Sequence, residues 1–295
     1  MLVRATAPSR RCAGPGRSQP RASSTASRQR GRRGARPPSP AADLGENAPL
    51  SATSLLDEVI EAHGGSERWQ TVSELSVDVS AGGFAVASKF QRRGLLDLVA
   101  RVSTDLQHVV LAPYPSDGHR GVFDGGAVRI EADDGRVVRQ RLDPRPELRT
   151  PRHLLWWDRL DLLYFAGSAL WTYMNTPFIL AAPRFQVEAI EPWPERGELW
   201  RPLEVTFPAE LHTHSQKQVF YFGPDGLIRR QDYTAEEFGT WARSAHYCHD
   251  HRDFHGLVVP TRRQVFLRRP DNRSRRHPVL IWLRVRDVSI YSRVD

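Results

Sequence analysis

The feature that most constrains the fold is a series of short segments, from residue 73 to residue 292, in which apolar and polar side chains alternate. Leu75, Val77 and Val79, for example, alternate with serine and aspartate, which is the pattern of a strand with one buried face. Gly125-Gly126 and Asp134-Gly135 supply tight turns, so we expect antiparallel pairing. The strands are predicted at 73–80, 84–92, 95–103, 106–112, 120–124, 127–132, 136–142, 185–191, 199–206, 216–222, 227–233, 243–252, 257–268 and 279–292.

The clearest hairpin is the segment FYFGPDGLIRR, residues 220–230. Pro224 fixes φ, Asp225 can bond its own backbone and Gly226 accepts a positive φ, which predicts a type I turn closed by a bulge. Counting outward from the turn sets three pairs opposite each other: Phe222 and Ile228, Phe220 and Arg230, and Gln218 and Asp232.

The strand pattern stops at about residues 153–180. Residues 162–182 are 21 positions without a charge, a length that could span a bilayer. Gly167, Asn175 and Pro177 interrupt this run, and no second apolar run exists. We therefore expect a broken, buried helix and no transmembrane span.

A capped helix is predicted to open the folded part of the chain. The segment SLLDEVIEAHGG, residues 54–65, offers Ser54 as N-cap with Asp57 three residues later, and Gly64 where the helix ends. Ser66 can cap a further turn that carries Trp69. The buried stripe of the first helix is predicted to be Leu55, Leu56, Val59 and Ile60.

The positive charge of the chain lies in its first residues. The formal charge is +8, but residues 1–42 hold ten Arg and no acidic residue, so the rest has 32 basic against 34 acidic residues, a charge of −2. We therefore expect no nucleic-acid binding through the folded domain. The Arg-, Pro- and Ser-rich residues 1–50 are expected to be disordered. An organellar transit peptide and an RNA-binding segment at 28–36 are alternatives, but 40 Arg against two Lys favour translation of GC-rich DNA upstream of the true start.

Cysteine usage and the missing export signal indicate the compartment. Cys12 in the tail and Cys248 in the body offer no disulfide framework, which is typical of a reducing environment. No apolar run of a secretory signal follows Arg10-Arg11. We expect a cytoplasmic protein with a disordered tail, 1–50, and one domain, 51–295, with a helical insertion at about 153–180.

Two local motifs carry a resemblance to a known superfamily. The AHGG segment, the turn with Trp69 and the strand at 73–80 resemble the opening of bacterial lipoprotein-carrier proteins of the LolA/LolB-like superfamily, and DFHGLVVPT, 253–261, is similar to a late strand in it. The chain resembles an uncharacterised, actinobacterial-type member without an export signal. The resemblance implies an α+β fold, in which an antiparallel curved half-barrel sheet with an N-terminal helix and an inserted helical lid surrounds a cavity for acyl chains.

Aromatic residues are concentrated in the predicted insertion. Seven occur within 23 residues, where the overall 9% would give about two. Ligand sites are mostly apolar, so these residues are the candidate ligand-binding set: Trp156, Trp157, Tyr164, Phe165, Trp171, Tyr173 and Phe178. The alternative is that they fill the concave face of the sheet as ordinary core.

Polar candidates are concentrated in HYCHDHRDFH, residues 246–255. On a strand, one face would carry His246, Cys248 and Asp250 and the other face would carry His249, His251 and His255. Neither set has a standard metal-ligand spacing, and His212 and His214 could add to a site only if the sheet brings them near. We therefore expect no metal.

Other chemical motifs are missing or weak. The sequence has no phosphate-binding glycine loop and no nucleophile motif, so we expect no cofactor. Asp158 and Asp161 lie three residues apart on the predicted helix, where a solvated helix edge is expected rather than an acid and base pair.

The predicted function is non-covalent binding of a hydrophobic small molecule or lipid acyl chain in a lidded half-barrel cavity. Two alternatives stay open. One is an interaction protein with a filled core and no pocket. The other is a cavity enzyme, which would need six polar side chains within one cavity: His214, Asp232, Tyr233, His246, Asp250 and His251.

Overall fold

The computed structural model describes residues 51–293, so the expectations for the tail, 1–50, lie outside the described residues. The helices and 3-10 turns are α1 (Ala52–Ala62), α2 (Ser66–Gln70), α3 (Phe84–Ser88), η1 (Arg145–Arg149), α4 (Pro151–Leu155), α5 (Arg159–Asn175) and η2 (Phe178–Ala181). The strands are β1 (Val72–Gly82), β2 (Leu98–Ser103), β3 (His108–Ala112), β4 (His119–Asp124), β5 (Ala127–Ala132), β6 (Val137–Leu142), β7 (Gln186–Ala189), β8 (Trp193–Glu195), β9 (Glu198–Thr206), β10 (Lys217–Phe222), β11 (Ile228–Thr234), β12 (Arg243–Phe254), β13 (Leu257–Leu267) and β14 (Ile281–Ser292).

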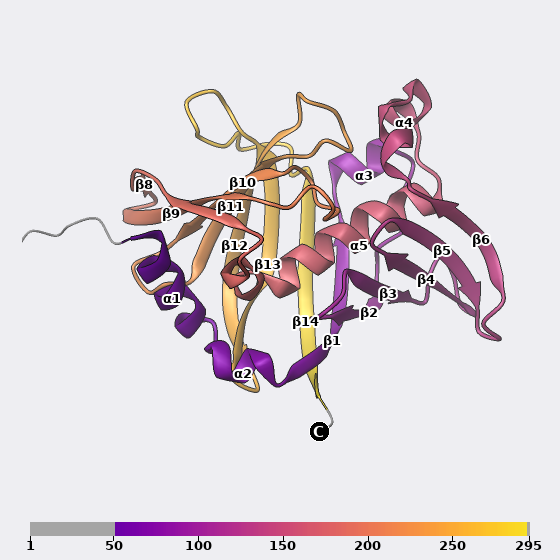
Figure 1. Cartoon of the computed structure of the whole chain (residues 1–295). Helices are drawn as coiled ribbons and strands as arrows, with labels where there is room; N and C mark the ends of the chain where they lie inside the picture. Colours follow the sequence, from indigo (N-terminus) through magenta and orange to yellow (C-terminus); the bar gives the residue numbers. More distant parts are fainter. Residues whose placement is uncertain (1–50, 294–295) are drawn as a thin grey trace, which may run out of the picture. The chain divides into compact units, whose positions relative to one another are not determined.

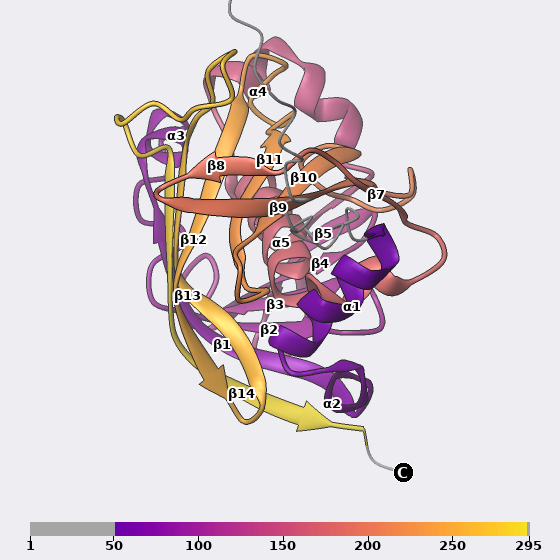
Figure 2. The same cartoon turned by 90° about the vertical axis from the view of Figure 1, so that its left-hand side faces the viewer.

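One antiparallel sheet organises the described residues. Its strand order is β6-β5-β4-β3-β2-β1-β14-β13-β12-β11-β10-β9-β7, and β8 pairs with β9. The first strand, β1, pairs with the last strand, β14, near the middle of the sheet. Figure 2 shows how strongly the sheet curves. The structure thus confirms the predicted α+β class with a curved, unclosed antiparallel sheet.

Helix α5 lies on the concave side of this sheet, between its two halves (Figure 1). Every residue from Leu160 to Asn175 is buried, so the helix is covered on all sides. At Gly167 a Cβ atom would lie 2.4 Å from the Cβ of Phe123 on β4, and glycine therefore allows the close approach of helix and sheet. None of the helices in 51–293 is long and apolar enough to cross a bilayer.

The acid pair at the start of α5 is buried, and the expectation of a solvated helix edge is wrong. Asp158 caps the helix by accepting the N–H of Asp161 at 2.9 Å, and the Asp161 carboxylate accepts the N–H of Asp158 at 2.9 Å. Arg141 and Arg152 also contact Asp161, at 2.6 and 3.1 Å. These arginines cover the carboxylates from β6 and α4, which helix spacing alone does not reveal.

The two motifs that carried the sequence resemblance contact each other. The N–H of Val258 on β13 donates to the carbonyl of His63, 3.0 Å away, and Arg68 donates to the carbonyl of His255, also at 3.0 Å. Gly64 has φ +123°, and a Cβ there would lie 2.1 Å from the carbonyl oxygen of Gly256. The AHGG segment therefore connects the end of α1 to the β12–β13 hairpin through close backbone contacts.

Both predicted helix caps are wrong in detail. The N-cap of α1 is Ser51, whose side chain accepts the N–H of Ser54, and α2 begins after Gly65 with no side-chain cap. The N-cap of α1 thus lies three residues before the predicted Ser54, and that of α2 lies one residue before the predicted Ser66. The predicted apolar stripe of α1 is buried as expected, with Leu55, Leu56, Val59 and Ile60 in the core.

Three details of the strand prediction are also wrong. The predicted strand 84–92 begins instead with α3, because Gly83 (φ +133°) turns the chain, and the N–H of Ala85 then donates to the carbonyl of Leu280. Strand β8 was not predicted. In the 220–230 hairpin, Phe222 faces Ile228 as predicted, but a register shift after this pair changes the others. The observed pairs are Tyr221 with Arg230, Phe220 with Gln231, and Val219 with Asp232.

Candidate functional site

A cavity of about 560 Å³ lies at one end of the sheet, where α3 and the β11–β12 connection meet the adjoining ends of β13 and β14. Its wall is mostly apolar. The lining residues are Phe84, Ala85, Ser88, Lys89, Leu154, Phe165, Tyr233, Ala235, Phe238, Trp241, Ala242, Ser244, Val265, Leu267, Pro278, Leu280 and Ile281.

The β11–β12 connection folds into a compact loop that forms one side of the cavity. The N–H of Ala235 donates to the carbonyl of Ala242 at 3.0 Å, and the N–H of Ala242 donates to the carbonyl of Gly239 at 3.0 Å. This loop turns Phe238 inward, where it is buried, and leaves Trp241 at the rim, 64% exposed. The same loop therefore supplies both inner wall and rim.

One cation lies on the apolar wall. The Lys89 side chain is buried, and its Nζ donates to the carbonyls of His153, at 3.1 Å, and Leu154. Within residues 51–293, no carboxylate forms an ion pair with this ammonium group. Burial lowers the pKa of Lys89. The carbonyls of α4 thus hold the ammonium group of Lys89 at the edge of the cavity, and no counter-ion comes from residues 51–293.

Of the seven aromatic residues predicted to bind ligand, the structure places Phe165 on the wall of this cavity. Phe165 and Tyr173 also border a second, much smaller cavity of about 30 Å³ between α5 and β1, β2 and β14. Trp157 lies behind the wall, with its ring centroid 4.6 Å from that of Phe238. The α5 helix thus nearly fills the concave face of the sheet, and the larger cavity lies beside it.

The other four aromatic residues lie apart from the cavity wall. The Nε1 of Trp171 donates to the carbonyl of Leu106 at 2.8 Å, in the core. Tyr164 shares a hydrogen bond of 3.0 Å with His212, and Phe178 stacks on Trp69 at 4.2 Å. Trp156 is 44% exposed. Ligand binding by the whole set of seven stays a prediction.

A buried polar network lies beneath the cavity and contains three of the six residues named for the enzyme alternative. His214 contacts Glu237 at 2.8 Å and the hydroxyl of Tyr173 at 2.9 Å. That hydroxyl lies 3.2 Å from the hydroxyl of Tyr233, which lies 3.4 Å from Nδ1 of His246. Figure 1 shows the strands β11 and β12, which carry Tyr233 and His246, facing α5, which carries Tyr173.

Burial favours the neutral forms of two members of this network. Burial lowers the pKa of His246 far below its ordinary value, and burial raises the pKa of Tyr233 well above its own. The hydroxyl of Tyr233 is used within the network, so this residue presents its ring to the cavity. Oε2 of Glu237 and Nε2 of His246 have no hydrogen-bond partner in the part of the chain that is described.

The remaining three residues of the enzyme alternative lie elsewhere. Asp232 is on the opposite face of the sheet, where Arg230 donates to both of its oxygens at 2.6 and 2.7 Å. Asp250 is exposed and pairs with Arg262 at 2.6 Å. His251 is half-buried, and burial lowers its pKa to about 4. The six residues therefore do not share one cavity.

Strand β12 is buried on both sides because apolar side chains also pack on the opposite face of the sheet. Trp200 of β9, Tyr221 of β10 and Tyr247 form a second apolar cluster there, and Trp193 of β8 packs against it. Tyr247 thus points away from its neighbours His246 and Cys248, as strand alternation predicts. Among the described residues, 51–293, no group of three or more His, Cys, Asp and Glu side chains could hold a metal ion.

The residues that form the cavity were mostly missed from the sequence. Phe84 and Trp241 each follow a glycine with positive φ by one or two positions, at Gly83 and Gly239. The signal in the sequence that could have indicated these two residues is an aromatic side chain that closely follows a glycine in a turn. Leu267, Leu280 and Ile281 lie at strand ends, and periodicity does not indicate which strand ends meet.

Comparison with known proteins gives likenesses of fold only. No family model matches the sequence, and no curated protein matches it. Among solved structures, a LolA superfamily protein from Nitrosomonas europaea is similar at 10% identity over 82% of this chain and 94% of that chain, with a TM-score of 0.45. A DUF1329 family protein from Desulfovibrio piger is similar at 11% identity over 81% and 91%, with a TM-score of 0.43. All of these TM-scores lie below 0.5, so the proposals below rest on this chain's own cavity and surface.

Proposed function

We propose that this protein binds a hydrophobic small molecule or an acyl chain, without covalent chemistry, in the cavity of about 560 Å³. The observation that carries the proposal is the composition of the wall, which is apolar on α3, the β11–β12 connection, β13 and β14. Small-molecule sites have volumes of about 300 to 1,000 Å³ and are lined mainly by apolar and aromatic side chains with few polar groups. Size and lining both fit this class of ligand.

The rim supports access from outside. Phe84 and Trp241 line the cavity and are 58% and 64% exposed, and Leu154 is 49% exposed. Apolar side chains at a cavity mouth provide an apolar surface for the ligand as it leaves water. They thereby lower the free-energy cost of its entry into the cavity.

Lys89 supports a preference for ligands with an anionic head. Its ammonium group has no carboxylate partner in the described part of the chain, and two of its three donors are directed at carbonyls of α4. An opposite charge within about 4 to 6 Å favours the charged form of an ionisable group. A fatty-acid carboxylate at the wall would supply that charge, and its chain would lie against the apolar residues.

The experiment compares two alanines on the same short helix. Ala85 lines the cavity, whereas Ala87 is half-buried on α3 and does not line it. Binding of N-phenyl-1-naphthylamine, a neutral fluorescent probe, is titrated with wild type, Ala85→Trp and Ala87→Trp, and palmitate is then used to displace the probe. We expect Ala85→Trp to lower probe affinity at least about tenfold, or about 1.4 kcal/mol, and Ala87→Trp to leave it unchanged.

Two further results test the head-group preference. Lys89→Met should weaken displacement by palmitate and leave displacement by hexadecanol unchanged, because only the acid carries a charge for Lys89 to bind. Absence of saturable probe binding by the folded wild type, or equal binding by both tryptophan variants, would refute a ligand site in this cavity.

A further inference from the structure

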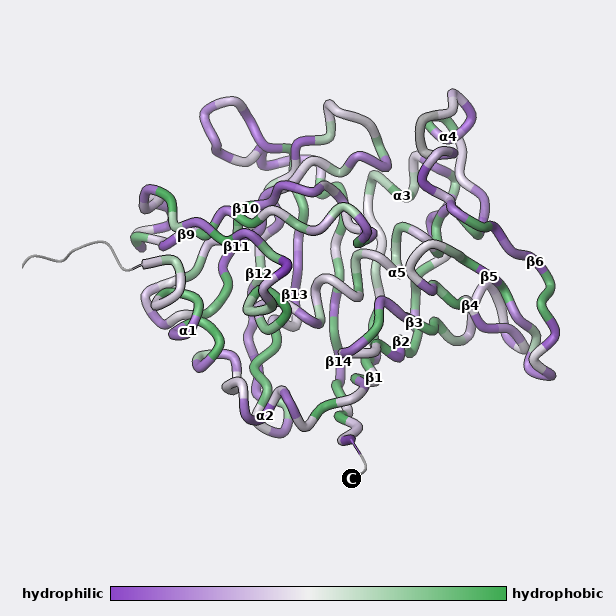
Figure 3. Tube along the Cα trace, in the orientation of Figure 1, coloured by the Kyte–Doolittle hydropathy of each residue, from purple (hydrophilic) through white to green (hydrophobic). Residues whose placement is uncertain are grey.

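A basic loop adjoins the mouth of the cavity. The connection between β13 and β14 includes residues 268–277, which contain five arginines and one aspartate, a formal charge of +4. Figure 3 shows this loop as a hydrophilic segment at the upper edge of the structure. It therefore carries a concentrated positive charge, although residues 43–295 together carry a charge of −2.

Most of this charge is exposed and free. Arg269, Arg273, Arg275 and Arg276 are exposed, and Arg269 pairs with Asp271 at 2.6 Å. For the other three, the described residues provide no ion-pair partner. A pocket of about 700 Å³ lies among them. Their charges are thus available to a partner outside the chain.

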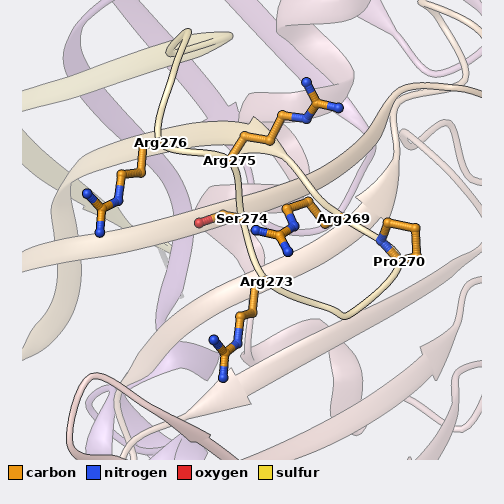
Figure 4. Close-up of a pocket in the computed structure, with 6 residues that line it drawn as sticks. All are labelled: Arg269, Pro270, Arg273, Ser274, Arg275 and Arg276. Atoms are coloured by element: carbon orange, nitrogen blue, oxygen red, sulfur yellow. The ribbon is translucent and has the colours of Figure 1, made fainter. Parts of the chain in front are cut away.

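The arrangement of these arginines does not fit a single small anion. Figure 4 shows the guanidinium groups of Arg273, Arg275 and Arg276 pointing in different directions, away from a common centre. A site for one phosphate would direct several donors at one point. Diverging cations fit a surface that carries many separate negative groups.

Exposed apolar side chains lie at the same end of the structure. Trp241, Phe84 and Leu154 line the cavity mouth, and Leu155 and Phe90 are 74% and 75% exposed nearby on α4 and after α3. Figures 1 and 2 both place α3, α4 and the β13–β14 loop along the upper edge.

The basic loop and the apolar rim surround one opening. Leu267 precedes the loop, and Pro278 and Leu280 follow it, and all three line the cavity of about 560 Å³. Any flat partner that contacts the loop arginines at this end would therefore lie across the cavity mouth.

From this juxtaposition we infer that the cavity mouth docks onto the surface of an anionic phospholipid bilayer. The loop arginines contact lipid phosphates, and juxtamembrane cations of this kind are attracted to anionic lipid within about a Debye length. Trp241 and Phe84 enter the interfacial region, where aromatic side chains are favoured. Leu154 and Leu155 favour a membrane over a nucleic acid, because aliphatic side chains do not stack on bases as aromatic ones do.

Docking gives the proposed ligand site a source of ligand, and in this respect it rests on the proposed function. With the mouth against the bilayer, an acyl chain can pass between membrane and cavity without crossing water. Passing through water would expose apolar surface at about 0.8 kcal/mol for each CH2 group.

The experiment measures flotation of the full-length protein with vesicles of phosphatidylcholine alone and of phosphatidylcholine mixed with phosphatidylglycerol. A loop variant, Arg273→Gln with Arg275→Gln and Arg276→Gln, is compared with a control variant, Arg136→Gln with Arg184→Gln and Arg252→Gln. The control removes the same charge from exposed arginines on other parts of the chain. Wild type and both variants contain the Arg-rich residues 1–42, so any vesicle binding by these residues is the same in all three proteins.

We expect wild type and control to bind only the vesicles with phosphatidylglycerol, and the loop variant to bind them at least about tenfold more weakly. Quenching of tryptophan fluorescence by brominated lipid should lose a component in Trp241→Phe, because that ring enters the interface. Equal binding by loop and control variants, or unchanged quenching in Trp241→Phe, would overturn the inference.

The remaining outcomes separate this inference from the proposed function. The loop variant should bind N-phenyl-1-naphthylamine as wild type does, because its three arginines do not line the ligand cavity. Vesicle binding without probe binding would leave docking standing and remove the ligand site. Probe binding without vesicle binding would leave the ligand site standing and remove docking. If wild type binds no vesicles but binds single-stranded RNA, and the loop variant loses that RNA binding, the surface is assigned to nucleic acid.

Discussion

Replacing Trp171 with alanine should destabilise the protein without weakening ligand binding, because this side chain of α5 is buried in the core and does not line the cavity of about 560 Å³. Trp171 is 1% exposed, and its Nε1 donates to the carbonyl of Leu106 at 2.8 Å. Truncating a buried Trp typically costs about 3 to 5 kcal/mol. The Leu106 carbonyl also accepts the N–H of His108 at 2.7 Å and so keeps a partner. The lost hydrogen bond then adds only about 0.5 to 1.5 kcal/mol, which places the total near the upper end of the range.

Phe165→Ala is the matched comparison on the same helix. One side of its ring borders the cavity of about 560 Å³, and the other side packs on Trp157, with ring centroids 5.4 Å apart. Fewer packing contacts are lost when part of a ring faces empty space. We expect a stability loss of about 2 to 3 kcal/mol together with a fall in probe affinity of at least about tenfold, or about 1.4 kcal/mol.

Urea unfolding followed by circular dichroism measures the stability, and fluorescence titration with N-phenyl-1-naphthylamine measures the affinity. Trp171→Leu serves where Trp171→Ala does not fold, because it retains part of the buried volume. If a Trp171 variant weakens probe binding as much as Phe165→Ala does, the Trp171 ring contacts the ligand. Helix α5 would then cover a ligand and would not simply fill the core.

Three further predictions concern the fold. Gly64→Ala should cost about 2 to 3 kcal/mol, because a Cβ there would lie 2.1 Å from the Gly256 carbonyl oxygen; an unchanged melting temperature contradicts this. Arg230→Met removes the two-pronged guanidinium contact of the buried Asp232 and leaves Arg268, 3.4 Å away, as its one arginine partner among the described residues; it should cost about 3 kcal/mol in urea unfolding, whereas adding Asp232→Leu should recover part of the loss. Burial lowers the pKa of His63 to about 4, so the unfolded chain, with an ordinary pKa of about 6.5, binds the proton first. The His63 contribution to stability should therefore be full above pH 6.5 and fall by about 1.4 kcal/mol per pH unit toward pH 4, and His63→Gln should reduce the slope of stability against pH by about that amount.

The curvature and order of the sheet show what local patterns can and cannot predict. Alternation located most strands, and turn glycines predicted antiparallel neighbours, because both signals act over a few residues. Pairing of β1 with β14 depends on residues more than 200 positions apart, such as Val77 and Val288, and no local signal specifies it. The hairpin at 220–230 was shifted by one residue because the position of a bulge depends on packing across the strands.

The cavity of about 560 Å³ was harder to predict than the fold. Counting aromatics between 156 and 178 located the residues that fill the concave face, and only Phe165 of these lines the cavity of about 560 Å³. Most of the wall comes from strand ends and loops whose meeting is a property of the whole sheet. The net charge of residues 43–295 likewise gives no indication of the basic loop. Acidic residues elsewhere offset the charge of its arginines, and a net charge does not show where the charges lie.

Ligand binding in the cavity is tested most directly by a methyl NMR titration of the protein with palmitate, read at the residues of the cavity wall. Ligand binding there should shift the methyl signals of Val265, Leu267, Leu280 and Ile281, which line the cavity. The methyl signals of Val109 and Leu111, buried on β3 beneath α5, should stay in place. If saturating palmitate leaves the signals of these four residues unchanged, or shifts only methyl groups on other surfaces, the cavity does not bind the acyl chain.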